Sequence, residues 1–400
     1  MDFQGMSAMN LWMNLISGNL LPMTNDVSSF PLFWRLYGVI TWLLLLTYMY
    51  GLISGFFYIP VEKIIKNGMI SVVIVVEVSV IITRIYTQKA LVRELIGKLN
   101  ENLRVQDAVM QDVLTTTLRS IKAPLQFYWV AGVMATFVWS CLPLPLILQR
   151  NTFYYVDLQT PLVYCKEPYS TVDFVLINIS VLISNVFIFI KKVAVDVYMT
   201  HLVLMITVQH LYTSRKLVSI FRDGNRQNNH CDLRKGYRAW ADCTTITKLK
   251  GLCRHHILAI NLTLMLKKLL SLNFSLIYVN SVFRFCSIAI LIFAIPSTSV
   301  IEGLAVCTFA CGEIVQLYIL CSCVHKLLDA STKITDEAFH EDWYRFGPCV
   351  KRTFMLIIMA SNVGFKLSTF ERFNLSLPSF MAILNQSYSI ALLILKMTRK

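Results

Sequence analysis

Several side chains in the sequence carry groups that enzymes and metal sites use. Asp196 and His256 supply a carboxylate and an imidazole, which are the groups of acid–base catalysis. No nucleophile motif, glycine-rich phosphate loop or metal-ligand spacing accompanies them in the sequence. No histidine cluster lies beside the two close cysteine pairs, Cys307/Cys311 and Cys321/Cys323, as a zinc site would need. We therefore expect packing roles for these residues, and neither an enzyme nor a bound metal or cofactor.

Glu77 is the charged residue with the most unusual position. It lies in the middle of a stretch rich in Val and Ile, 69–87, where a carboxylate is costly unless it meets a partner or a wet cavity. One interpretation is that Glu77 faces a ligand cavity, where it hydrogen-bonds a polar group of the ligand or stays protonated. The other is a structural bond to a neighbouring helix. Arg284 and Glu313 pose the same question, and a structural role is favoured for both.

Polar side chains interrupt the last apolar segment, 374–396, in mid-span. On a helix, residues three and four apart share a face, so Gln386, Ser389, Leu393 and Lys396 form one stripe. The stripe is polar at its start, apolar at Leu393 and charged at its end. Several copies around an axis would enclose a water path narrowed by a ring of leucines, a form of hydrophobic gate. The alternative is that these groups attach the helix to its neighbours.

The elements that must position these residues are membrane spans. The chain has 400 residues, of which 56% are hydrophobic and 15% charged, and its mean hydropathy is +0.59. A soluble protein of this length would carry about a quarter charged residues. The formal net charge of +14 is divided among loops between apolar segments. Membrane topology therefore explains the charge better than nucleic-acid binding does.

Hydropathy and helical periodicity predict an all-α membrane protein with seven transmembrane helices and no internal repeat. Polar, helix-patterned segments extend several spans, and 222–236 is the best candidate for a loop. The segment near Leu11–Leu21, which Asn14 and Asn19 interrupt, looks like a helix at the membrane surface. The expected spans are 33–57, 69–87, 128–148, 172–190, about 276 to Pro296, 301–325, and a last helix broken into 350–365 and 374–396.

The distribution of basic residues predicts the orientation. The loops after the second, fourth and sixth spans carry most of the 37 Lys and Arg, which places the N-terminus inside the cell. G-protein-coupled receptors have the opposite orientation, and this bias argues against that class. Most of the eleven cysteines then lie in apolar spans or on the reducing side. Only Cys165 and Cys141 remain candidates for a disulfide.

Four stretches in the second half of the sequence resemble the insect odorant receptor family. The final one is the most specific, with its Leu-Ser-Leu, its Phe and its Ser-Tyr-Ser. The related gustatory receptors usually show a different pattern there. The longer inner loop of the shared odorant co-receptor is also missing, so the chain resembles a ligand-tuning subunit. The four stretches are Ala194–Gln209, Leu252–His256, Ala338–Tyr344 and Leu375–Ser389.

The resemblance implies a subunit of an odorant-gated, non-selective cation channel that forms a heterotetramer with the co-receptor. In such channels the last half of the final helix lines the pore, which places the narrowing at Leu393 with Lys396 one turn outward. Trp343 and Tyr344 would be contacts of a cytoplasmic anchor between subunits, or they mark the membrane surface. The expected location is the plasma membrane, in the dendrite of a sensory neuron, with membrane lipid and a small volatile odorant as partners and no nucleic acid.

The same resemblance places the odorant pocket in the outer membrane half. A site for volatile ligands should be apolar, aromatic and sparsely polar. For each candidate, helix packing is the alternative to ligand contact. The candidates are Glu77, Phe137, Cys141, Phe174, Asn178, Val181 and Phe309.

These expectations divide the chain into regions of different role. A seven-helix receptor that signals through a cytoplasmic partner, or a gustatory-type receptor, is the alternative to the channel; a transporter is disfavoured by the missing repeat. The regions are an interfacial segment, 1–32; transmembrane helices one to four, 33–190; cytoplasmic helix extensions, 191–275; helices five and six, 276–325; the anchor connector with the first half of helix seven, 326–372; and the pore helix with the tail, 373–400.

Overall fold

The fold is nearly all helical in the computed structural model, which describes residues 2–24, 30–60, 63–64, 68–103, 107–229, 235–294, 300–361 and 375–398. Within these ranges the structure contains no named β-strand and only an isolated bridge between Phe153 and Tyr169. The α-helices are α1 (Ala8–Ile16), α2 (Leu32–Tyr58), α4 (Met69–Thr87), α5 (Lys89–Leu103), α6 (Ala108–Cys141), α7 (Thr171–Asn229), α8 (Lys235–Ala294), α9 (Val300–Phe339), α10 (Pro348–Ser361) and α11 (Leu377–Thr398). Short 3₁₀ turns are η2 (Leu144–Leu148), η3 (Tyr155–Asp157) and η5 (Trp343–Arg345).

Seven of these helices are long and apolar enough to cross a membrane, which confirms the predicted all-α membrane fold. The second predicted span, 69–87, coincides with α4, and α2 differs from its prediction by one residue at each end. The last element is divided as expected into α10 and α11. The expected loop 222–236 is too long, because its described residues 222–229 and 235–236 are helical and belong to α7 and α8. The rest of that loop, the predicted helix end at Pro296 and part of the break in the last helix lie outside the described residues.

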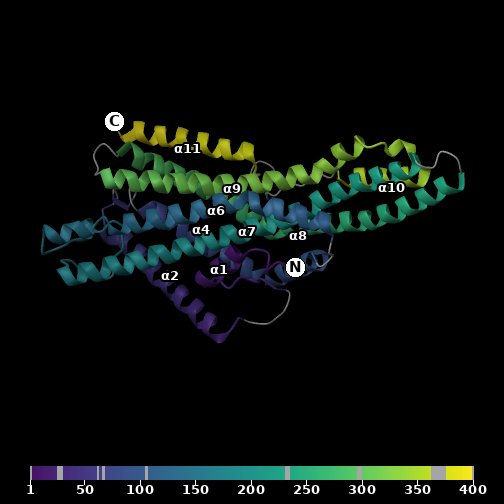
Figure 1. The fold of residues 1–400 in the computed structure, drawn as a ribbon. Helices are drawn as coiled ribbons and strands as arrows, with labels where there is room; N and C mark the ends of the chain where they lie inside the picture. Colours follow the sequence, from purple (N-terminus) through teal and green to yellow (C-terminus); the bar gives the residue numbers. More distant parts are fainter. Residues whose placement is uncertain are drawn as a thin grey trace.

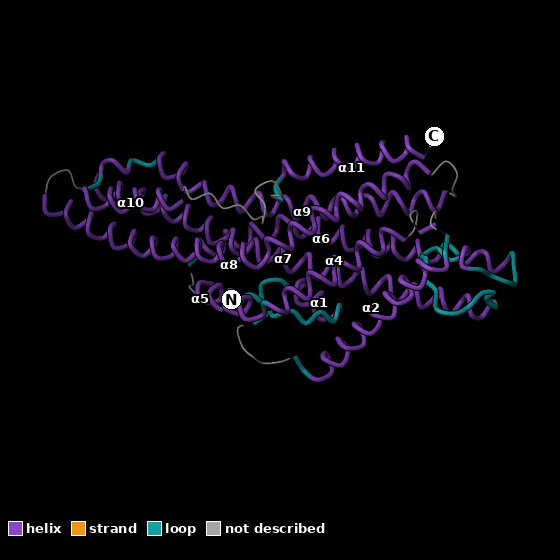
Figure 2. The backbone as a smooth tube through the Cα atoms, turned by 180° about the vertical axis from the view of Figure 1, so that it is seen from behind, coloured by secondary structure: helices purple, strands orange, loops and turns teal. Residues whose placement is uncertain are grey.

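The helices form an elongated bundle in which α7, α8, α9 and α10 continue past the ends of α2, α4 and α11 (Figure 1). Helix α8 alone has 60 residues, which is roughly 90 Å at 1.5 Å per residue. Since a bilayer core is about 30 Å thick, much of this helix must lie outside the membrane. Helices α2 and α11 lie on opposite sides of the bundle, as both views show (Figures 1 and 2).

Two helices are longer than the spans predicted for them. Helix α6 begins at Ala108 rather than near 128 and continues through Pro124. A proline inside a helix frees the carbonyl four residues earlier, here that of Ser120, whose hydroxyl accepts a hydrogen bond from Lys326 Nζ at 3.2 Å. Helix α9 continues fourteen residues past the predicted end at 325, to Phe339. Polar helical extensions carry no hydropathy signal, which is why the predicted spans stop short.

The N-terminal segment packs against α7 and does not merely lie beside the bundle. Asn14 and Asn19, which interrupt its apolar pattern, are both buried. Asn14 Nδ2 donates to the Leu21 carbonyl at 2.9 Å, and Asn19 Nδ2 donates to the Lys191 carbonyl at 3.1 Å. Phe3 is fully buried, and its backbone N–H donates to Asn100 Oδ1 at 2.7 Å. The two asparagines therefore attach the segment to the bundle.

The predicted pairing of Cys141 with Cys165 is wrong, because both are free thiols. Cys165 belongs to a loop that is packed on α2 and α7. Its carbonyl accepts hydrogen bonds from the hydroxyls of Tyr155 at 3.1 Å and Tyr169 at 3.2 Å, which fix that part of the loop. Burial raises the pKa of the Tyr164 phenol in the same loop to about 12. Aromatic packing thus takes the structural role for which the disulfide was considered.

Candidate functional site

A partly open apolar cavity of about 100 Å³ lies between the helices at the end of the bundle that carries the 150–170 loop. Its wall is mostly aliphatic and aromatic, with a few hydroxyl and amide groups, which is the usual make-up of a small-molecule site. The lining residues are Tyr48 from α2; Ile70, Ser71, Ile74 and Val75 from α4; Ala135, Thr136 and Trp139 from α6; Thr160; Asn185, Ile188 and Phe189 from α7; Leu291 from α8; and Ala305, Val306 and Phe309 from α9.

The polar groups on the wall are fixed by bonds within the bundle. Asn185 Nδ2 donates to Ser140 Oγ at 3.0 Å, which leaves the amide oxygen and the second N–H of the amide. The Thr136 hydroxyl donates to the Gly132 carbonyl at 2.7 Å, so its oxygen retains acceptor capacity. The cavity can therefore hold a compact apolar molecule and accept hydrogen bonds from it at fixed points.

Only one of the predicted pocket residues, Phe309, lies on the cavity wall. Phe137 is half exposed on the outer surface of α6, and Cys141 is partly buried at the C-terminal end of that helix. Phe174 is buried and stacks on Phe153, with 4.1 Å between ring centroids. Near it, Asn178 Nδ2 donates to the Phe174 carbonyl at 2.8 Å, while Val181 belongs to the same outer apolar cluster. These five residues surround or cover the cavity region without lining it.

The wall residues that sequence reasoning missed lie on the same helices. On α7, Asn185 follows the predicted Asn178 by seven residues, which is two turns deeper on the same face. On α6, Thr136 is the neighbour of Phe137 and points inward where Phe137 points outward. The signal that could have found them was depth: the predicted positions were chosen too close to the outer ends of the spans.

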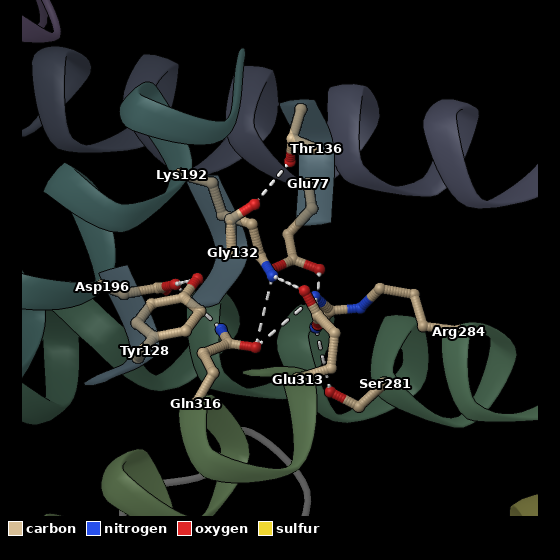
Figure 3. A network of polar contacts seen from close by, with 10 residues as sticks. All are labelled: Glu77, Tyr128, Gly132, Thr136, Lys192, Asp196, Ser281, Arg284, Glu313 and Gln316. Atoms are coloured by element: carbon tan, nitrogen blue, oxygen red, sulfur yellow. Dashed lines mark hydrogen bonds and ion pairs between the residues drawn. The ribbon is translucent and has the colours of Figure 1, made fainter. Parts of the chain in front are cut away.

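Glu77 lies in a buried cluster of charged residues rather than on the cavity wall. Its Oε2 is 3.4 Å from Arg284 NH2, and both side chains are only 1% exposed. Arg284 also pairs with Glu313, and Lys192 Nζ lies 2.6 Å from Glu313 Oε1. These residues belong to α4, α7, α8 and α9, and Figure 3 shows their side chains converging. The arrangement matches the structural alternative for Glu77, Arg284 and Glu313, since a buried charge without a partner is strongly unfavourable.

Polar groups on three helices extend the cluster. Gln316 on α9 donates from Nε2 to Asp196 Oδ2 at 2.9 Å, and its Oε1 accepts from Lys192 Nζ at 3.3 Å. The hydroxyl of Tyr128 on α6 donates to the same Asp196 oxygen at 3.0 Å (Figure 3). His256, the other half of the conceivable catalytic pair, is buried beside His210 with 6.3 Å between ring centroids. Within the described chain, neither nitrogen of His256 has a hydrogen-bond partner, so His256 is not bonded to Asp196.

Helix α11 has one face in the bundle and one face uncovered. Ser387 is buried; its hydroxyl donates to the Ile383 carbonyl of its own helix at 2.7 Å and also lies 3.3 Å from the Val282 carbonyl of α8. Gln386, Ser389, Leu393 and Lys396 are exposed. Gln386 Oε1 also accepts from the Tyr278 hydroxyl at 3.3 Å. The predicted stripe thus exists as a continuous outward face, which no part of the described chain covers.

The two predicted anchor residues differ in exposure. Trp343 packs on Phe354 with 5.2 Å between ring centroids, whereas Tyr344 is 56% exposed. Tyr344 donates its hydroxyl to Asp342 Oδ1 at 2.8 Å. Of the two, only Tyr344 presents its ring on the surface beside η5.

Asp107 lies outside the spans, at the N-terminal end of α6. It accepts hydrogen bonds from Lys216 Nζ at 2.7 Å, Tyr212 at 2.9 Å and the Val109 N–H at 3.0 Å. The bond from the Lys216 ammonium lowers the pKa of the Asp107 carboxyl, because it stabilises the charged form. Among the described residues, no three His, Cys, Asp or Glu side chains gather as a metal site would require.

Comparisons with known proteins agree with this geometry. The chain is similar over 96% of its length to a solved structure of the insect olfactory receptor OR5 from Machilis hrabei in complex with eugenol, with a TM-score of 0.78, 13% identity and 97% of that chain covered. A second structure of the same receptor matches with a TM-score of 0.76, 13% identity and 97% of both chains covered. At this identity the likeness shows the fold alone. A search of curated protein sequences found no match. A sequence model of the family described as 7tm Odorant receptor matches residues 62–388, and because this is most of the chain, the protein belongs to that family.

Proposed function

We propose that the protein is the odorant-binding subunit of a ligand-gated, non-selective cation channel. Its cavity takes a small volatile molecule, and α11 lines the pore. The N-terminus lies inside the cell and the membrane is the plasma membrane of a sensory neuron. The bias of Lys and Arg toward alternate loops supports the orientation, and membership of the odorant receptor family supports the role.

The observation that carries the proposal is the uncovered polar face of α11. Gln386 and Ser389 lie in a span of 20 residues, Leu377–Lys396, where hydrocarbon would offer their polar groups no partner. Several copies of this face around an axis would give them water instead. Leu393, 61% exposed, would then form the narrowest, apolar ring. A ring of Lys396 side chains would repel cations, so a mixed tetramer, in which only some subunits carry the lysine, suits a cation channel better.

The cavity supports the ligand-binding half of the proposal. The solved OR5 structure holds eugenol, and the corresponding molecule for this chain must fit about 100 Å³ unless the wall moves. An engineered apolar cavity of about 150 Å³ binds benzene. The expected odorant is therefore compact, with few polar atoms. An agonist opens the channel only if it binds the open state more tightly than the closed one.

Cysteine accessibility tests the pore. Gln386→Cys, Ser389→Cys and Leu393→Cys subunits are co-expressed with the co-receptor, and current is recorded while a charged thiol reagent is applied. We expect irreversible block at all three positions. Ala391→Cys is the matched control, because Ala391 lies on the buried face of α11 and should stay unmodified. The parent chain controls for the native exposed thiols of Cys165, Cys307 and Cys311. Current that survives modification at all three positions would refute the pore assignment.

Filling the cavity tests the ligand site. A broad odorant panel is applied with and without the co-receptor, and each active compound is retested on Phe309→Trp, whose larger ring occupies the space. Responses should fall, with unchanged surface expression. Phe127→Trp is the control, because Phe127 lies on the outer surface of α6. Equal losses in the two variants would argue against binding in this cavity.

A further inference from the structure

The cavity and the charged cluster are adjoining layers of the same helices. Each helix that contributes to the cavity wall from α6 to α9 also contributes a cluster residue within about two turns. This relation holds for Thr136 and Tyr128 on α6, Phe189 and Lys192 on α7, Leu291 and Arg284 on α8, and Phe309 and Glu313 on α9. The cluster thus lies next to the cavity, about one to two turns farther along the same helices.

Phe189 is the residue that touches both layers. It lies on the cavity wall, and its ring occupies the space where a Cβ at Gly132 would be. The ring also meets Tyr128 edge-on, with 5.8 Å between centroids and an interplanar angle of 69°. Lys192 Nζ lies 5.8 Å from the centroid of the Tyr128 ring. A molecule that displaces Phe189 therefore displaces Tyr128, and with it the hydrogen bond to Asp196.

Arg284 is the cluster residue that lies closest in the chain to the α8 residues in contact with α11. It lies on α8 between Val282 and Cys286, the two residues that bond Ser387 of α11. Ser387 donates to the Val282 carbonyl, and Cys286 Sγ donates to the Ser387 carbonyl at 3.3 Å. Arg284 holds this part of α8 against α9 and α4 through Glu313 and Glu77. Any change in how the cluster pairs its charges therefore bears on the α8–α11 contact.

We propose that the charged cluster transmits occupancy of the cavity to the pore helix, with Tyr128 and Arg284 as positioning residues. This inference rests on the proposed channel function. A buried cluster suits the task because it cannot absorb a small displacement gradually: a lost contact leaves a charge unpaired, and the cluster must re-pair. Close-packed interiors likewise switch between arrangements rather than deform continuously. Displacement of Phe189 thus becomes a shift of α8, and the shift releases Ser387.

A mutant cycle on spontaneous opening tests the transmission without a known odorant. Channels with the co-receptor are recorded with no odorant added, and open probability per channel is measured for Phe189→Leu, Ser387→Ala and the double variant. If the two sites act independently, the fold-change in open probability of the double variant equals the product of the two single-variant fold-changes, to within about twofold. We expect the double variant to depart from that product by more than about threefold. In a Tyr128→Phe background, which keeps the ring and removes the hydroxyl, the departure should disappear.

Tyr198→Phe is the matched control background. Tyr198 is equally buried, and its hydroxyl bonds the Pro22 carbonyl, away from the cluster; the departure from the product should persist there. A purely structural role would change the number of channels and not the open probability of each one. Phe189→Met replaces Phe189→Leu if the latter does not reach the surface.

The failure of the transmission and the failure of the channel proposal give different results. If the channel conducts and the open probabilities of the variants follow the product rule in every background, the proposed transmission alone is overturned. The absence of any current from the unmodified chain with the co-receptor, spontaneous or evoked by an odorant panel, would overturn both.

Discussion

The charged cluster and the outward face of α11 place the same kinds of side chain at membrane depth and satisfy them in opposite ways. In the cluster, carboxylates, a guanidinium and an ammonium from four helices find partners within the chain. On α11, Gln386 and Ser389 are exposed, and their bonds within the chain are those of Gln386 with Tyr278 and of Ser389 with its own helix. Because hydrocarbon supplies no hydrogen-bond partner, the charges of the cluster are paired in a single chain, whereas the remaining polar capacity of the α11 face needs water or another subunit. The difference separates polar residues that hold the fold from polar residues that serve an assembly.

Arg284→Met should have the largest effect, because it removes the cation that faces two buried carboxylates. Loss of one member of a buried ion pair typically costs about 3–5 kcal/mol, a large part of the stability of most domains. Thermal unfolding of purified protein in detergent would show the loss. Arg222→Met is the control, since the exposed pair of Arg222 with Glu341 should contribute at most about 1 kcal/mol. Equal losses of thermal stability in both variants would mean that the buried ion pairs of Arg284 contribute no more than the exposed pair of Arg222.

Leu393→Ser should change opening rather than stability. An exposed leucine on the uncovered face contributes little to the fold of one chain, but a ring of leucines excludes water from a narrow path. Removing about 1.5 kcal/mol of apolar contact should raise spontaneous opening by about tenfold. Single-channel recording checks this, with melting temperature as the control. A lower melting temperature without a change in opening would mean that Leu393 stabilises the folded chain and does not close the pore.

Ser387→Ala and Ser389→Ala compare the two faces of α11 directly. Ser387 is buried and bonds α8, so its loss should cost about 1 kcal/mol of stability. Ser389 is exposed and donates only to the Asn385 carbonyl of its own helix, so its loss should cost less than about 0.5 kcal/mol. Chemical unfolding of the two purified variants gives the order. The reverse order would mean that the faces have been assigned wrongly.

Asp107→Asn should have the smallest effect, and the difference in stability between the variant and the parent should be present near neutral pH and disappear in acid. The Asp107 carboxyl has a lowered pKa in the folded protein because Lys216 donates to it. Its contribution to stability is therefore complete above the ordinary pKa of 3.8 and is lost as the pH falls through the lowered value. The variant should lack this acid-dependent part, so its melting temperature should change less than that of the parent between about pH 5 and 3. An unchanged slope would show that the ion pair is not formed in solution.

The fold could be predicted from the sequence wherever hydropathy carries the signal. The stretch 69–87 was long enough and apolar enough to be a helix in its entirety, and α4 has those bounds. The extensions of α6 and α9 were underestimated because polar helical segments resemble loops in hydropathy. The stripe on α11 was predictable because spacing alone determines which residues of a helix share a face.

The site was harder to predict, because it depends on which helices meet. Glu77 stood out as costly, but its partner Arg284 lies more than 200 residues away, and no local pattern joins them. Phe309 borders the cavity and Phe174 does not, although both are aromatic residues near the outer ends of spans and local sequence does not distinguish them. Which of them borders empty space is decided by Phe153, which fills the position beside Phe174. The position of a cavity depends on how side chains from several helices pack together, so it cannot be predicted from any one stretch of sequence.

The buried Phe3 has a consequence for the biogenesis of the chain. Its ring contacts Tyr198 and His201, so its binding place does not exist until about 200 residues have been made. At about 5–20 residues per second, the newborn amino end waits roughly 10 to 40 seconds. A fluorescent tag fused at the amino end must therefore leave Phe3 able to reach Tyr198 and His201 after α7 has formed.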